Sequence, residues 1–119
     1  MPADAQNDPA RDARLGELRE RFAATLEKRV AAIVGGVTAV RVGPWCAAPG
    51  DALLTDVHAL SGSAGLFGAD RIGEMAAAVE RLLMALQRRA SITAVDVAML
   101  REAVQRLQAA YDARRDAST

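Results

Sequence analysis

Four stretches of this 119-residue sequence repeat apolar residues at steps of three and four, the spacing of one helix face. They cover residues 15–33, 53–67, 72–86 and 97–111. Aromatic residues make up only 3% of the chain while 51% of it is hydrophobic, so these faces must pack mainly through aliphatic side chains. With short connections between the later stretches, the pattern predicts an all-α fold, an antiparallel four-helix bundle with a long N-terminal helix.

Residues typical of helix ends place the first boundaries. Asp8 followed by Pro9 predicts an N-cap and the first turn of the long helix. Asp51 is expected to cap the second helix, and Asp70 to begin the third. Gly68 stands where the second helix should end in a left-handed residue.

The sequence gives different signals for the first and last connections between helices. Residues 35–49 contain Gly-Gly, Gly-Pro and Pro-Gly pairs and predict an irregular connection or a frayed helical end, although residues 37–42, rich in β-branched side chains, also fit a strand. Thr93 with Asp96 three positions later resembles a capping box before the fourth helix. This reading divides the chain into a disordered N-terminal segment at 1–8, the bundle at 9–115 and a polar tail at 116–119.

Charge and composition exclude several classes of function. Fifteen basic residues balance fifteen acidic ones, so the chain lacks the basic excess of a protein that coats nucleic acid. One cysteine and one histidine exclude a disulfide and a multi-histidine metal site. No secretory signal and no long apolar run are present, so we expect a cytoplasmic protein without membrane contact. The apolar faces are consumed within one bundle, which favours a monomer.

The single histidine, His58, falls on the polar side of the second helix. At about 100° per residue it lies roughly 140° from the apolar stripe, so its imidazole is expected to face outward. Leu54 precedes it by one turn, and Ser61, Gly62 and Gly65 follow it. Glycine inside a helix costs about 0.5–1 kcal/mol relative to alanine, and either close helix packing or the approach of a partner would explain that cost.

Glu80 lies at about the level of His58 in an antiparallel hairpin that turns at Gly68. There its carboxylate can accept a hydrogen bond from one ring N–H, leaving the other ring nitrogen as a nucleophile. A solvated glutamate paired with Arg81 or Arg88 fits the sequence equally well.

The run HALSGSAGLFG that begins at His58 resembles the signature of histidine phosphotransfer (HPt) domains. That signature has an apolar residue two positions after the histidine, usually lysine at three, glycine at four, small residues, and glycine at ten. The matching positions are His58, Leu60, Gly62, Ser63, Ala64 and Gly68. Ser61 departs from it, because the family commonly has lysine there. The resemblance covers roughly residues 53–86.

The resemblance implies that residues 9–115 form an HPt-like bundle acting as a phosphocarrier in a multistep two-component phosphorelay. His58 would accept a phosphoryl group from a receiver-domain aspartate and pass it to another receiver, with Glu80 orienting the imidazole. The implied partners are response-regulator receiver domains and a sensor or hybrid histidine kinase. No cofactor or metal is expected in this chain, since Mg²⁺ belongs to the receiver. The receiver docking face around His58 would comprise Leu54, Ser61, Gly62 and Gly65.

Two other classes of function compete with the carrier. A non-transferring four-helix interaction module, or degenerate HPt domain, would bind a receiver or partner helix through the same face and would not need His58. An enzyme with independent turnover is disfavoured, because the chain has no P-loop and no nucleophile paired with its histidine.

Overall fold

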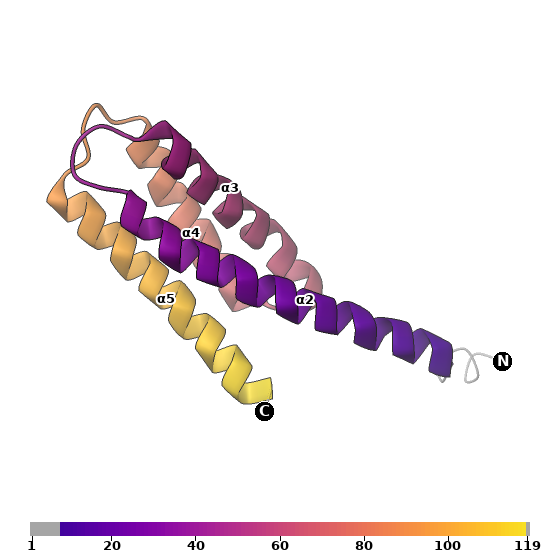
Figure 1. Ribbon diagram of the computed structural model, residues 1–119. Helices are drawn as coiled ribbons and strands as arrows, with labels where there is room; N and C mark the ends of the chain where they lie inside the picture. The colour runs from indigo at the N-terminus through magenta and orange to yellow at the C-terminus, as the bar shows by residue number, and fades with distance from the viewer. Residues whose placement is uncertain (1–7, 119) are drawn as a thin grey trace.

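The computed structural model describes residues 8–118 and shows four long helices that run antiparallel in a bundle (Figure 1). The helices are α2 (Pro9–Gly36), α3 (Ala47–Ala64), α4 (Asp70–Gln87) and α5 (Ala94–Ser118), with short 3₁₀ helices η1 (Val37–Ala39) and η2 (Gly65–Phe67). Helix α3 packs against α2 and α4, and α5 packs against α4 and α2. The described part of the chain contains no strand, so the predicted all-α four-helix bundle is confirmed. Most of the predicted segment 1–8 lies outside the described residues.

The core of the bundle is aliphatic and draws on all four helices. Burying one Val, Leu or Ile side chain away from water stabilises the fold by about 1.5–3 kcal/mol. The largest of the core's fully buried side chains within the helices are Val30 and Ile33 of α2, Leu53, Val57 and Leu60 of α3, Ile72, Val79 and Leu83 of α4, and Leu100 and Leu107 of α5. These residues lie on the predicted apolar faces, which therefore set the packing of the bundle.

Three residues of the predicted faces are exposed. Leu15 and Leu18 of α2 are 40% and 47% exposed, although the same stripe buries Phe22 further along the helix. The cause is length, because the N-terminal turns of α2 project beyond the other helices (Figure 1). Phe67 is 39% exposed because it lies in η2, past the end of α3.

The start of α2 follows the prediction, whereas the connection to α3 does not. The Asp8 carboxylate accepts a hydrogen bond from the backbone N–H of Ala10 at 3.0 Å, and Pro9 occupies the first turn. The helix then continues through Gly36 into η1, and no strand forms at 37–42. The irregular connection is thus shorter than the predicted 35–49, since α3 already begins at Ala47.

Asp51 lies inside α3 instead of capping it. The sequence predicts Pro49 in the connection, but in the structure it lies in the first turn of α3. A proline is compatible with that position, because its missing N–H would have no partner within the helix. The Asp51 carboxylate accepts hydrogen bonds from Nε1 of Trp45 at 3.2 Å and from Nε2 of Gln87 at 3.0 Å. Gly50 makes room for the indole, since a Cβ there would lie less than 3 Å from three of its ring atoms.

A tight turn joins α3 to α4. Gly68 adopts a left-handed conformation with φ of 73°, which glycine takes without steric cost. The N–H of Ala69 donates to the carbonyl of Ala64 at 2.9 Å, closing the end of the helix. Asp70 is the first residue of α4 as predicted, but no side chain caps that helix. This turn fixes the register of the α3–α4 hairpin.

The opposite end of the bundle is closed by backbone and side-chain contacts. Gly43 and Ile92 form an isolated antiparallel bridge, with hydrogen bonds of 2.9 and 2.7 Å between their backbones. The capping box predicted before α5 is present: the N–H of Asp96 donates to the Thr93 hydroxyl at 3.1 Å, and the N–H of Thr93 donates to the Asp96 carboxylate at 2.9 Å. Arg89 also donates to that carboxylate, at 2.5 Å. The two connections are thereby tied together.

Candidate functional site

His58 stands on the outer face of α3. Its side chain is 76% exposed, while Val57 and Leu60 on the same helix are fully buried. The helical period places the imidazole outside because the other side of α3 belongs to the core. The outward orientation predicted from the sequence is therefore what the structure has.

Glu80 of α4 reaches across the hairpin to the imidazole. One of its carboxylate oxygens, Oε2, is hydrogen-bonded to Nδ1 of His58, and the Glu80 side chain is only 20% exposed. An ionised carboxylate only accepts hydrogen bonds, so Nδ1 is the nitrogen that carries the proton. In a neutral imidazole the lone pair then lies on the other nitrogen, Nε2. Of the two interpretations of Glu80, the structure has the contact with His58, and no described ion pair joins it to Arg81 or Arg88.

Ser61 completes this group of polar side chains. Its hydroxyl donates to the backbone carbonyl of His58 at 2.9 Å and lies 3.5 Å from Oε1 of Glu80. The hydroxyl has one proton, so the shorter contact is the one that holds it. Both carboxylate oxygens of Glu80 thus have a polar neighbour on α3. Ser61 adds no positive charge beside the histidine.

The two glycines that follow His58 are not needed for packing within the bundle. A Cβ at Gly62 would meet nothing within 4 Å, and a Cβ at Gly65 would meet only Oδ1 of Asp70, at 3.9 Å. Close helix packing therefore does not explain Gly62. Both residues are exposed, and they leave the surface beside His58 without side chains.

Gly73 is the glycine that lets the two helices approach, a role that was not predicted from the sequence. A Cβ there would lie 3.4 Å from Cβ of Ala64 and 3.7 Å from the carbonyl oxygen of Ser61. The signal in the sequence is its spacing, because Gly73 precedes Glu80 by seven residues, or two turns on one helix face. Small residues at this point bring α4 close enough for Glu80 to reach His58.

An apolar pair lies on the other side of the histidine. Leu54 is half-buried against the core, one turn before His58. Met84, one turn after Glu80, is expected in the core from the sequence, yet it is 41% exposed. The pairing of His58 with Glu80 sets a register that brings Leu54 and Met84 to the same level of the hairpin. The outer face thus has bare backbone on one side of His58 and apolar side chains on the other.

Within residues 8–118, no three or more His, Cys, Asp or Glu side chains gather closely enough to hold a metal ion. None of the described helices has an apolar stretch long enough to cross a membrane.

Comparison with known proteins identifies a family. The family model of the Hpt domain matches residues 17–110, which is most of the chain and includes the whole His58–Glu80 hairpin. No curated protein and no solved structure matches the chain.

Proposed function

The chain belongs to the Hpt domain family, and on that premise we propose that it is a phosphocarrier of a multistep two-component phosphorelay with His58 as the phosphoacceptor. Membership of this family implies histidine phosphotransfer in general. The observation that carries the assignment to His58 is its exposed imidazole, held at Nδ1 by Glu80 with Nε2 directed away from that contact.

The proposed step is a direct transfer between two side chains. The lone pair of Nε2 attacks the phosphorus of an aspartyl phosphate on a receiver domain, the P–N bond forms, and the P–O bond to the aspartate breaks. The receiver's carboxylate leaves with the bonding electrons, so no proton has to move. The reverse reaction with a second receiver's aspartate passes the phosphoryl group on.

Glu80 supports this step in two ways. Its hydrogen bond keeps the proton on Nδ1, which leaves Nε2 as the nucleophile. Its negative charge also lies next to the ring, which gains positive charge as the P–N bond forms. We assign it as a positioning residue. The receiver, with its own Mg²⁺, neutralises the phosphoryl oxygens in this proposal.

The docking face follows from the surface around His58. Gly62 and Gly65 let a receiver approach the backbone of α3, while Leu54 and Met84 offer apolar contact. Ser61 provides no cation for an acidic receiver. The exposed ion pair that a lysine would make there is worth about 0–1 kcal/mol of binding free energy. We place this interaction in the cytoplasm, with the carrier as a monomer and a sensor or hybrid histidine kinase upstream of the receiver.

The test is transfer of labelled phosphate from a panel of phosphorylated receiver domains to the native chain and to His58→Gln. We expect acid-labile, base-stable label on the native chain and none on the variant. If no receiver labels the native chain while both proteins still bind receivers, the carrier assignment is wrong. That result would establish the non-transferring interaction module, which Ser61 in the usual lysine position makes the second candidate.

A further inference from the structure

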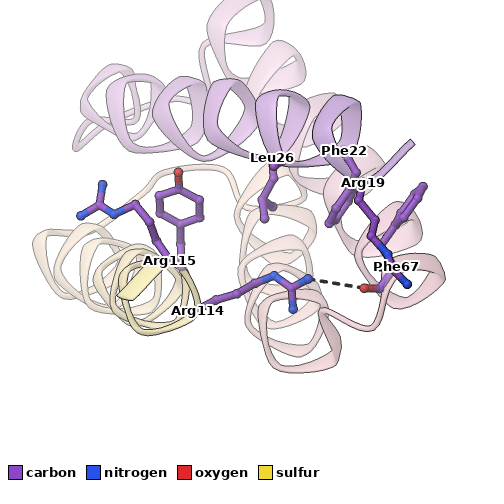
Figure 2. A pocket seen from close by; sticks show the side chains of 8 residues that line it. Arg19, Phe22, Leu26, Phe67, Arg114 and Arg115 are labelled. Carbon is purple, nitrogen blue, oxygen red and sulfur yellow. Dashed lines mark hydrogen bonds between the residues drawn. The ribbon is translucent and has the colours of Figure 1, made fainter. Parts of the chain in front are cut away.

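A concave surface lies at the end of the bundle where α2 projects. It is a cavity of about 370 Å³ between α2 and the C-terminal part of α5, beside the turn that follows α3 (Figure 2). It shares no lining residue with the group around His58. The residues that line it are Arg19, Phe22, Ala23, Leu26, Phe67, Tyr111, Arg114 and Arg115.

The floor of the cavity is aromatic and continues into the exposed leucines of α2. The rings of Phe22 and Phe67 stack with their centroids 4.2 Å apart and their planes 15° apart. Leu18 and Leu15, which are 47% and 40% exposed, extend the same face of α2 toward its N-terminus. There the helix projects beyond its neighbours (Figure 1). From Leu15 to Leu26 this apolar strip runs about 16 Å along the helix. We call the cavity and this strip together the terminal groove.

The rim of the terminal groove is cationic. Arg115 lies over the ring of Tyr111 at 5.8 Å, and Arg114 donates to the carbonyls of Phe67 and Gly68 at 3.4 Å (Figure 2). None of the described side chains that line the cavity is acidic. Asp112, 3.7 Å from Arg115, offsets part of this charge from outside the cavity.

Helix α2 adds further positive charge on the same side. In the turns of α2 that precede Phe22, three arginines lie within about 80° of it around the helix: Arg11, Arg14 and Arg19. The acidic residues on that side are Asp12 and, at the N-cap, Asp8, whereas Glu17 and Glu20 lie more than about 130° away. The groove thus combines an apolar floor with flanks that favour an acidic partner.

We propose that the terminal groove binds an acidic amphipathic helix of a partner protein, which lies along α2 and α5 and continues the bundle. Its apolar face would cover Leu15, Leu18 and the cavity floor, and its Asp or Glu flanks would face the arginines. The length of the strip favours a helix, because a small ligand in the cavity would leave the two leucines uncovered. The concave shape with walls on two helices disfavours a flat membrane surface. A second copy of the chain would place arginine flanks against arginine flanks.

The test uses two synthetic helical peptides of about 20 residues with the same leucine stripe, one flanked by Glu and the other by Lys. Binding to the full chain is measured by fluorescence anisotropy and mapped by amide shifts in NMR spectra. We expect saturable binding of the Glu peptide alone, with shifts centred on residues 15–26 and on Phe67. Arg19→Glu should weaken binding about tenfold. Arg101→Glu, an exposed arginine about 20 Å from Arg114 along α5, is the matched control and should change it less than about twofold.

Leu18→Gln should leave the fold intact, because the Leu18 side chain is already exposed. This variant should also bind the Glu peptide more weakly. Equal binding of both peptides, no saturable binding, or shifts centred on His58 would overturn the proposal. Self-association abolished by Leu18→Gln would assign the groove to a second copy. Binding of the chain to vesicles that contain phosphatidylglycerol, but not to the Glu peptide, would assign it to a membrane. His58→Gln should bind the Glu peptide like the native chain, which separates this proposal from phosphotransfer.

Discussion

Replacing Gly62 by alanine should make the protein more stable and a poorer phosphocarrier. Gly62 is helical, and a Cβ there meets nothing within 4 Å in the folded chain. Alanine is favoured over glycine in a helix by about 0.5–1 kcal/mol, and no steric cost within the bundle opposes this gain. The added methyl group nevertheless stands one turn after His58, on the surface where we propose that a receiver approaches.

The stability gain corresponds to a rise in melting temperature of about 2–5 °C for a domain of this size. It is measured by thermal denaturation followed by circular dichroism, together with the rate of phosphotransfer from a receiver that labels the native chain. We expect the rate to fall about tenfold, the effect of misplacing the reacting atoms by a fraction of an ångström.

Gly35→Ala is the matched control. Gly35 is also helical and exposed, with nothing within 4 Å of an added Cβ, but it lies in α2. It should raise the melting temperature by a similar amount and leave transfer unchanged. A lower melting temperature for Gly62→Ala would refute the account of its local energetics. A higher melting temperature with an unchanged transfer rate would refute the role of Gly62 in receiver approach.

Three further predictions follow from contacts described above. Glu80→Ala should slow phosphotransfer about tenfold, while Glu80→Gln, which retains an oxygen that accepts from Nδ1 of His58, should recover part of the rate in the same assay. Gly50→Ala should destabilise the fold by about 1–2 kcal/mol in a urea titration, because overlap with the Trp45 ring outweighs the gain in helix propensity; a stabilised variant would contradict the packing seen there. The hydrogen bond from the backbone N–H of Thr93 lowers the pKa of Asp96 below its ordinary value of 3.8, against the opposing effect of burial and with help from the Thr93 hydroxyl and Arg89. The ionised carboxylate therefore stabilises the fold above pH 4, and this stabilisation is lost as the pH falls through the lowered pKa. The difference in free energy of unfolding between the native chain and Asp96→Asn should accordingly narrow between pH 5 and pH 3.

The sequence predicts the parts of this structure that depend on local periodicity. The exposure of His58 follows from its angle to the buried stripe of α3, and the level of Glu80 follows from the turn at Gly68. The capping box of Thr93 and Asp96 is likewise a signal of four consecutive residues. Such features need no knowledge of distant neighbours.

Features that depend on neighbours could not be predicted in this way. The periodicity of α2 continues through Leu15 and Leu18, and nothing in it tells where the adjacent helices end. The start of α3 was misplaced because Pro49 and Gly50 suggest a loop, whereas the structure uses the proline in a first turn and the glycine beneath Trp45. Whether Gly62 or Gly73 carries the contact between α3 and α4 depends on side-chain directions in both helices.

The bridge between Gly43 and Ile92 has a consequence for the motions of the bundle. It joins the two connections on either side of the α3–α4 hairpin, so the segment that holds His58, Ser61 and Glu80 is closed into a ring of backbone at its base. Fraying that begins at either terminus has to pass this ring before it disturbs the hairpin. Amide exchange should therefore be slowest within the hairpin and fastest in the first turns of α2, so that His58 and Glu80 keep their geometry while the ends of the molecule open and close.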